Sequence, residues 1–395
     1  MLGRRRLARN RALAGSQKIA TVSAILAHAG CQVTVFSLGA VAERSFRFYP
    51  AFRGLIAESS VPVLYQTDWD IPAIGRIWGA LGLLYSLLKE YRRHRVDVAI
   101  VYNCGLPEAI AARVLACVAG VPVVLEYEDD ASKGPDGRRS WRQRCHLLGL
   151  RIIRKTVRGV IAVSPQLLSQ FDLPNRYILR GVLNDDLAGL QPPPDVDSAR
   201  LRFMFAGSIQ QSKGVNALCE AWTQARLPGC ELHVAGEGPL LAGLRAKFGH
   251  AADIYFHGFV SRGRLLDLFR SAHVLVNPHH VTSDVGAVFP FKLIEYLGTG
   301  RPVISTPMAP LENPLASGIL YSRSDSPAHL AEAMRNMQHD FPQWLSKARI
   351  SMEEAWRVCG PLPTRNGVLK ILEDAVRAAD GMRQPSKDVA ASPQA

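Results

Sequence analysis

The chain has 395 residues and lacks an apolar run long enough for a membrane-spanning helix. Its strongest candidate, residues 71–88, contains Arg76 and three glycines and falls short of the roughly 20 apolar residues that a span requires. An apolar segment is also missing after the basic N-terminus, so we expect no signal peptide. We interpret residues 71–88 as a buried or interfacial helix.

Paired cysteine motifs are absent as well. The seven cysteines are odd in number, widely scattered and never separated by two residues. This pattern argues against a disulfide framework and against zinc, and it is typical of a reducing compartment. We therefore expect a cytoplasmic protein that uses no metal and no bound cofactor.

Acidic residues are too few to balance the basic ones. There are 47 Lys and Arg against 34 Asp and Glu, a formal net charge of +13, which predicts an anionic partner. The basic clusters at 4–18 and 133–158 lack the interleaved aromatics of single-strand nucleic-acid binders. We expect an anionic substrate or peripheral contact with an anionic membrane surface, and no nucleic acid.

Strand and helix patterns alternate in two blocks, on either side of a proline-rich segment at 190–195. Such alternation predicts an α/β protein with parallel sheets covered by helices on both faces. The Arg-rich residues before 14 do not resemble the strand that usually opens such a domain. The expected strands are 32–37, 60–65, 96–102, 120–127, 160–164, 201–206, 230–235, 254–256, 274–277 and 303–305. The expected helices are 14–29, 107–119, 214–225 and 262–271.

Residues 289–305 combine a turn, a short helix, a glycine stop and a buried strand. Glu295 lies within the helix among apolar neighbours, and a charge in that setting requires a partner. A carboxylate can accept two hydroxyl groups of a ligand, and the backbone N–H groups at the start of the helix suit a phosphate. A diol and a phosphate within one helix length describe a nucleotide. A structural ion pair with a nearby Lys or Arg is the alternative for Glu295.

Two further segments join a strand to a polar loop. Residues 205–214 contain Gly207 and Lys213, and a lysine after such a strand can supply a point charge for a phosphate. Residues 233–239 end in the Gly236-Glu237-Gly238 turn. Its glycines either serve a turn with positive φ or allow a nucleobase to approach the bare backbone.

Four acids follow the strand at 120–127, and we weigh two interpretations for them. A run of charge is commonly a solvated turn. Alternatively, Glu126 or Asp129 accepts a hydrogen bond from an acceptor hydroxyl or deprotonates it. The full set is Glu126, Glu128, Asp129 and Asp130.

Residues 141–158 form an amphipathic basic pattern. It indicates either a scaffold helix with a basic outer face or a helix that lies on anionic lipid.

Together these segments resemble the retaining nucleotide-sugar glycosyltransferases of family 4 (glycosyl transferases group 1), which have the GT-B fold. The resemblance is specific over residues 200–310 and looser over 14–190, where Gly15 and Ser16 contribute to it. It implies two Rossmann-like, doubly wound parallel-sheet domains facing a cleft. The implied organisation is an acceptor-binding domain at 1–190, a nucleotide-sugar domain at 198–360, a helix at 361–382 packing back on the first domain, and a disordered tail at 383–395.

The resemblance also implies roles for single residues. Glu295 resembles the second glutamate of the family's E-x7-E motif, which binds the ribose hydroxyls. Lys213 resembles the lysine that neutralises the departing diphosphate. With Glu126 and Asp129 these make up the catalytic set. The implied donor-binding residues are Gly207, Ser208, Gly236, Glu237, Gly238, Phe289, Pro290, Phe291, Lys292 and Leu293, while Gly15 and Ser16 lie on the acceptor side.

The chain departs from the family pattern at two positions. The first motif glutamate is Ala287 here, so its sugar contact is lost or taken by Asp284. Many relatives have arginine where Ser208 stands, which leaves one cation fewer for the diphosphate; Arg262 and Arg264 are the candidates to compensate for it.

We therefore expect metal-independent, retaining transfer of a sugar from a nucleoside diphosphate to a hydroxyl of a glycan or lipid-linked saccharide. The expected setting is cell-surface polysaccharide or glycolipid biosynthesis at the inner face of a membrane. The main alternative is a degenerate member that binds a nucleotide sugar or glycan without turnover. An epimerase of the same fold is a second. An ion pair of Glu295 within the protein, with no opening beside it, would argue against the enzyme.

Overall fold

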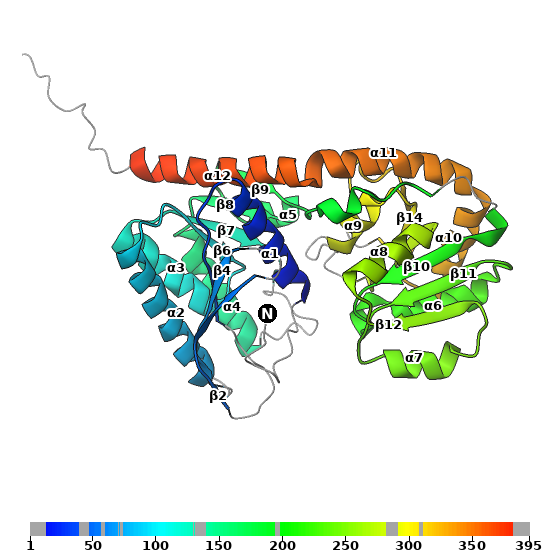
Figure 1. Cartoon of the computed structure of the whole chain (residues 1–395), viewed down its shortest axis with the longest axis horizontal. Helices are drawn as coiled ribbons and strands as arrows, with labels where there is room; N and C mark the ends of the chain where they lie inside the picture. Colours follow the sequence, from blue (N-terminus) through cyan, green and yellow to red (C-terminus); the bar gives the residue numbers. More distant parts are fainter. Residues whose placement is uncertain are drawn as a thin grey trace, which may run out of the picture. The chain divides into compact units, whose positions relative to one another are not determined.

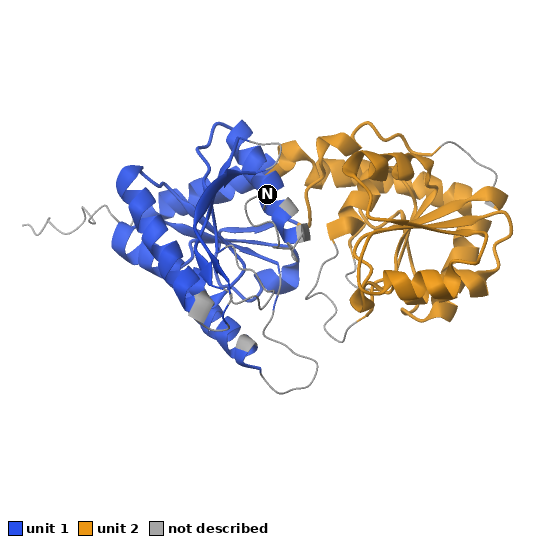
Figure 2. Cartoon of the chain, turned by 60° about the horizontal axis from the view of Figure 1, so that its bottom comes forward, with its two compact units in different colours: residues 1–179, 365–395 blue, residues 180–364 orange. Residues whose placement is uncertain are grey.

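The structure is a computed structural model of the whole chain. It describes residues 13–38, 47–56, 60–69, 71, 74–128, 130, 140–193, 198–281, 291–307 and 311–381. The chain divides into two compact units, residues 1–179 with 365–395 and residues 180–364 (Figure 2). The predicted tail at 383–395 and the Arg-rich start at 1–12 lie outside the described residues.

Unit 2 is built on a parallel sheet of six strands among its described residues, in the order β12-β11-β10-β13-β14-β15 (Figure 1). The chain starts at the centre with β10, moves outward to β12, and crosses back to continue with β13 on the other side. This is a doubly wound arrangement. The bounds are β10 Arg202–Ala206, β11 Glu231–Ala235, β12 Ile254–Gly258, β13 Val274–Asn277, β14 Val303–Ser305 and β15 Ile319–Tyr321.

The helices of unit 2 cover both faces of this sheet. Ser261 caps α8 and Ser326 caps α10, each accepting a hydrogen bond from a backbone N–H in the first turn. Sequence patterns predicted α6 and α8 but missed α7, α10 and α11. The bounds are α6 Val215–Ala225, α7 Leu241–Phe248, α8 Arg262–Ser271, α9 Phe291–Gly298, α10 Pro327–His339 and α11 Phe341–Cys359.

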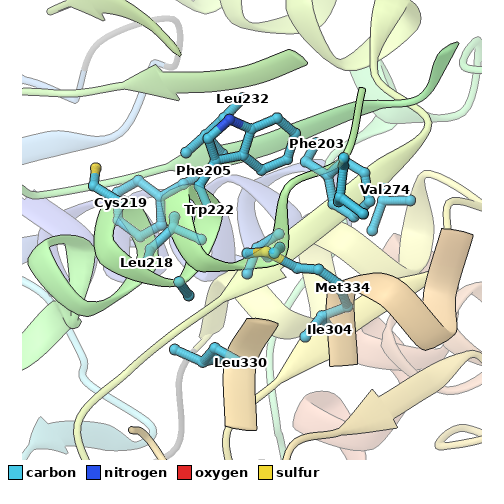
Figure 3. Packing of buried hydrophobic residues seen from close by; sticks show 14 of the residues in the cluster. Phe203, Phe205, Leu218, Cys219, Trp222, Leu232, Val274, Ile304, Leu330 and Met334 are labelled. Atoms are coloured by element: carbon cyan, nitrogen blue, oxygen red, sulfur yellow. The ribbon is translucent and has the colours of Figure 1, made fainter. Parts of the chain in front are cut away.

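The core of unit 2 lies between β10, β13 and the helices α6 and α10. Phe203, Phe205 and Val274 are fully buried, because strands covered on both faces are apolar throughout (Figure 3). Trp222 of α6 packs edge-on against Phe203, and its indole N–H donates to Asp253 over 2.9 Å. This packing holds the loop after β10 on a rigid base.

Unit 1 contains a parallel sheet of four strands among its described residues, in the order β6-β7-β8-β9. Two smaller sheets, β1-β4-β3 and β2-β5, accompany it. Two pairings that the alternating pattern did not predict, β3 with β4 and β2 with β5, are antiparallel. Only six residues join β3 to β4, too few for a parallel crossover. The bounds are β1 Val35–Ser37, β2 Phe48–Tyr49, β3 Phe52–Leu55, β4 Pro62–Tyr65, β5 Asp68–Trp69, β6 Ala99–Tyr102, β7 Val123–Tyr127, β8 Gly159–Ala162 and β9 Arg176–Ile178.

The helices α2, α3 and α4 of unit 1 are neighbours, with α3 in contact with both others. Helix α12, Pro361–Gly381, belongs to unit 1 from Arg365 onward. There the carbonyl of Ile371 accepts a hydrogen bond from the Asn175 amide over 2.9 Å. The remaining bounds are α1 Leu13–His28, α2 Ile74–Arg93, α3 Leu106–Ala119, α4 Trp141–Arg154 and α5 Pro165–Leu168.

The boundary between the units falls after Leu179, earlier than the proline-rich segment where we expected it. The reason is packing on unit 2. The N–H of Leu183 donates to the Cys359 carbonyl, and Leu183, Leu187 and Leu190 are buried. Within the described ranges, no helix is long and apolar enough to cross a bilayer.

Candidate functional site

The strand order of unit 2 reverses between β10 and β13, and the segments that follow these strands form the candidate site. Residues 207–214 follow β10, and residues 278–281 follow β13. In open parallel sheets, ligands bind beyond the carboxyl ends of the strands at such a reversal. The loop at 205–214, where we predicted a phosphate, therefore lies where the topology favours a ligand.

Glycines bring two loops into backbone contact at this edge. Gly207, Gly236 and Gly238 all have positive φ, of 146°, 142° and 159°. A Cβ on Gly236 would lie 1.8 Å from the Gly207 carbonyl oxygen, and one on Gly238 would lie 2.2 Å from the Ile209 carbonyl oxygen. The turn interpretation thus accounts for Gly236 and Gly238. Ser208 and Glu237 are exposed between these contacts.

Lys213 contacts His279 across the two segments. Gly214 is left-handed, and a Cβ there would lie 1.7 Å from the Pro278 carbonyl oxygen, so the segments approach closely. The Lys213 ammonium lies 3.0 Å from Nε2 of His279. Burial, and then the charge of Lys213, lowers the pKa of His279 to about 4. His279 is therefore neutral near pH 7, with Nε2 accepting from Lys213 and Nδ1 donating to the His280 carbonyl.

A pocket of about 310 Å³ lies beside the same two segments, and its lining is acidic, not basic. Its lining includes Gln211, His280 and Asp325. His280 Nδ1 lies 2.8 Å from the Asp325 carboxylate, which also accepts from the Val281 N–H. With Glu220 and Asp325 in its lining, this pocket suits a phosphate poorly.

Lys292 brings a second ammonium group to the site. Its nitrogen is buried, lies 4.1 Å from the centroid of the Phe205 ring, and has no hydrogen-bond partner among the described residues. A Cβ on Gly207 would lie 3.8 Å from that nitrogen. Burial, and then the nearby Lys213, lowers the pKa of Lys292 well below its usual value. An anion placed here would favour the charged form of Lys292 and so oppose both effects.

Tyr296 anchors helix α9 to the end of β10, and sequence reasoning missed it. Its buried hydroxyl accepts from the Ala206 N–H over 2.8 Å and donates to the Ala206 carbonyl over 3.0 Å. The residue before the glycine loop is thereby tied to the helix that carries Lys292. Among the other predicted donor residues on α9, Leu293 is buried and Phe291 is half-buried.

Glu295 has a counter-group on the protein, contrary to our expectation. Arg262 donates to Oε1 of Glu295 over 2.5 Å and binds Asp186 with two further hydrogen bonds of 2.7 and 2.8 Å. The burial argument failed because Arg262 lies 33 positions away in the sequence and its approach depends on how α8 packs. The Glu295 side chain is 26% exposed, and no described residue donates to its second oxygen.

Arg262 is therefore not the spare cation suggested for the Ser208 position, because two carboxylates neutralise it. Arg264 is exposed and its charge acts on His257. Lys292 is the cation that the structure places beside Gly207. Phe289, Pro290, Asp284 and Ala287 lie outside the described residues.

In unit 1, Glu126 and Glu128 are buried in an ion-pair cluster. Lys18 of α1 lies 2.9 Å from Glu126 and also pairs with Glu128, which accepts from the Tyr102 hydroxyl. A solvated turn is thus wrong for these two acids. Burial raises the pKa of Glu128, and the charge of Lys18 opposes that rise.

This cluster holds helix α1 against the sheet. A Cβ on Gly15 would lie 2.8 Å from the Tyr102 hydroxyl oxygen, which gives Gly15 a packing role, and Ser16 is half-buried beside it. Glu126 is only 3% exposed, so its burial argues against direct contact with an acceptor. Asp129 lies outside the described residues. In the part of the chain that is described, no three His, Cys, Asp or Glu side chains gather as metal ligands.

Comparison with known proteins identifies the class. Residues 200–340 match the family model of glycosyl transferases group 1, and residues 15–173 match that of the glycosyl transferase 4-like domain. The fold, with its two Rossmann-like units, is that of GT-B glycosyltransferases. The chain belongs to the glycosyl transferases of group 1.

Solved structures share this fold at low sequence identity. Sucrose-phosphate synthase from Thermosynechococcus elongatus aligns with a TM-score of 0.69 at 15% identity, covering 91% of this chain and 93% of that one. HepE from Anabaena, solved with UDP-glucose, aligns with a TM-score of 0.66 at 12% identity, covering 91% and 95%.

A curated relative is the O-antigen chain mannosyltransferase C of Escherichia coli. It is 30% identical over 141 residues, which are 34% of this chain and 36% of the relative. The chain therefore matches about a third of that protein's length.

Proposed function

We propose that the protein transfers a sugar, with retention of configuration, from a nucleoside diphosphate to a hydroxyl of a glycan or lipid-linked saccharide. The observation that carries the proposal is the meeting of Lys213, Lys292 and the Gly207 loop at the point where the strand order of unit 2 reverses. Two ammonium groups and a neutral histidine at such an edge suit a diphosphate.

The diphosphate would bind between the two lysines. Burial lowers the pKa of Lys292 in the unliganded site, and a bound phosphate would raise that pKa by favouring the charged form. Lys213 then stabilises the negative charge that develops as the sugar–phosphate bond breaks. No metal is required for this charge balance.

The ribose would bind to the second oxygen of Glu295. Arg262 holds the first oxygen and is itself fixed by Asp186, so the carboxylate keeps one orientation. This gives Arg262 a positioning role and leaves Glu295 to accept a ribose hydroxyl. Phe289 and Pro290 remain proposed donor contacts, with the backbone amides of Phe291 to Leu293.

The acceptor would bind to unit 1, with Asp129 as the proposed base for its hydroxyl. Glu126 and Glu128 support this region by fixing α1 through Lys18. The name of the Escherichia coli relative supports a role in polysaccharide synthesis, and the UDP-glucose in the HepE structure supports a nucleotide-sugar donor. We place that reaction in the cytoplasm, at the inner face of a membrane.

A radiolabelled transfer assay tests the proposal. The full chain is incubated with UDP- and GDP-sugars and with membrane lipid extracts as acceptor, and the released nucleoside diphosphate is measured alongside labelled product. We expect both to appear in equal amounts with one donor. Nucleotide-sugar binding without diphosphate release would contradict transfer.

Binding without release of diphosphate would instead support the alternative, a protein that binds a nucleotide sugar or glycan without turnover. The ion pair of Glu295 with Arg262 favours it, because a carboxylate that already has a partner binds a ligand less strongly.

A further inference from the structure

Helix α2 presents an apolar stripe to solvent. Ile77, Trp78, Leu81 and Tyr85 are 64%, 48%, 58% and 66% exposed. At about 100° per residue these four side chains lie within an arc of about 100° on one side of the helix. Leu83 and Gly79 are buried on the opposite side. Helix α2 is therefore amphipathic, with an outer apolar face that no described residue covers.

Two exposed aromatic residues lie on strands that precede the helix in the chain. Strand β5 precedes α2 directly and contacts it, and Trp69 of β5 pairs edge-on with Phe48 at 6.4 Å between ring centroids. Phe48 is 53% exposed and Trp69 is 39% exposed. These two rings are a second exposed apolar contact, on strands β2 and β5.

Basic residues follow the stripe at the other end. Lys89, Arg92 and Arg93 are exposed, and the Lys89 ammonium lies 5.7 Å from the Tyr85 ring centroid. The same helical spacing places Arg92 within the stripe, Lys89 at its edge and Arg93 outside it. Contiguous apolar patches bordered by charge usually mark an interaction site.

We propose that this outer face of α2 docks on an anionic lipid bilayer, with Ile77, Trp78, Leu81 and Tyr85 entering the interfacial region and Lys89 and Arg92 contacting lipid phosphates. Tryptophan and tyrosine favour the boundary between headgroups and acyl chains. An apolar face with basic residues beside it is the pattern of helices that lie in that plane. The net charge of +13 adds long-range attraction to such a surface.

A second copy of the chain is a weaker fit to the same surface. A two-fold contact places identical patches together. Parallel α2 helices would bring their arginines together, and antiparallel ones would place them against the apolar stripe of the partner. Either arrangement leaves the arginines without an opposite charge, which is unfavourable, whereas anionic headgroups would pair with them.

Helix α4, our sequence-based choice for a lipid contact, is the lesser candidate. Its outer face carries Trp141 and Leu148 with Arg144 between them, so its apolar residues are not contiguous. It lies next to α3, which in turn contacts α2, and its arginines would add attraction without insertion.

Vesicle sedimentation of the full chain tests the proposal without requiring turnover, so it is independent of sugar transfer. Vesicles of phosphatidylcholine alone are compared with vesicles containing phosphatidylglycerol. We expect binding to the anionic vesicles, weakened by high salt, and about tenfold weaker for Ile77→Ser with Leu81→Ser. The matched control, Ile350→Ser with Leu362→Ser, changes exposed apolar residues of α11 and α12 and should bind as the wild type does.

Fluorescence quenching by brominated lipid locates the contact, even if a serine variant folds poorly. Quenching should fall for Trp78→Phe and remain for Trp141→Phe. Equal binding by the stripe and control variants, quenching lost only in Trp141→Phe, or no binding to anionic vesicles would overturn the proposal. A dimer that the stripe variants convert to monomer, with vesicle binding unchanged, would assign the face to a second copy instead.

Discussion

The ammonium nitrogen of Lys292 lies 4.1 Å from the centroid of the Phe205 ring, and no described residue accepts a hydrogen bond from it. A buried cation without an anionic partner is unfavourable. Binding of an anion beside Lys292 would therefore lower the free energy of the site. This relationship connects the fold of unit 2 to the chemistry that we propose for it.

Replacing Lys292 with methionine should stabilise the unliganded protein, because it removes an ammonium group that is costly to bury. The folded pKa of Lys292 is depressed, so between that pKa and about 10.4 the unfolded chain binds more protons than the folded one. The stabilising effect should therefore shrink as pH rises toward 10. Urea unfolding at pH 7 and pH 9.5 measures it. Lys347→Met, which alters a lysine 4.3 Å from the Trp344 ring centroid, is the control, and the same pH dependence in both variants would contradict the idea.

At a pH above the unliganded pKa of Lys292, binding of a nucleoside diphosphate should take up a proton at this side chain. The phosphate raises the pKa of the ammonium, so the affinity falls as pH rises through the interval between the unliganded and liganded pKa values. Calorimetry in buffers with different ionisation enthalpies measures the protons bound. Proton uptake should disappear in Lys292→Met, and uptake that persists in this variant would assign it to another group.

Lys213→Ala should slow sugar transfer by about 10²–10³-fold, which is the scale for losing one preorganised charge on the leaving group. Folding should be preserved, because Lys213 is half-buried. Single-turnover rates with a saturating donor separate this loss from weaker binding. Lys247→Ala changes a lysine on α7 and serves as the control. A reduction confined to KM would show that Lys213 only binds the donor.

The second oxygen of Glu295 should discriminate between ribose and deoxyribose. A hydrogen bond to a charged group contributes about 1.5–3 kcal/mol, so the wild type should bind a ribonucleoside diphosphate roughly 10–100-fold more tightly than its dideoxy analogue. Glu295→Ala should bind both equally, and Arg262→Met should reduce the preference. Equal affinity of the wild type for the two nucleotides would remove Glu295 from the ribose site.

Lys18→Met should destabilise unit 1 by about 3–5 kcal/mol, since removing one partner leaves buried carboxylates without a counter-charge. Adding Glu128→Gln should recover part of the loss, because the remaining amide carries no charge. Thermal and urea unfolding of the single and double variants measure this coupling. Strict additivity of the two changes would contradict the ion-pair cluster.

Much of unit 2 could be predicted because its signals are local. The buried strand at 274–277, the glycine stop after α9 and the lysine after β10 each depend on a few neighbouring residues. Short-range pattern therefore pointed to the loop with Lys213 and to the helix with Lys292, and the alternation of strands and helices implied the doubly wound sheet.

The contacts between distant segments could not be predicted. Arg262 reaches Glu295 and Asp186 from another helix, and Tyr296 binds the Ala206 backbone 90 positions away. Lys18 reaches Glu126 from α1 across the sheet. Each of these contacts depends on how a helix packs against the sheet. The spacing of the residues in the sequence therefore does not predict the contact. For this reason we expected Glu126 to be more exposed than it is, and we expected Glu295 to lack a partner within the protein.

The most direct test of the donor site is the affinity for UDP and GDP of the wild type and of the double variant Lys213→Ala, Lys292→Met, measured by calorimetry. We predict that the wild type binds at least one of them and that the double variant loses at least a hundredfold in affinity, while Lys247→Ala with Lys347→Met binds normally. Unchanged affinity in the Lys213, Lys292 variant would show that the nucleotide does not bind where β10 and β13 diverge.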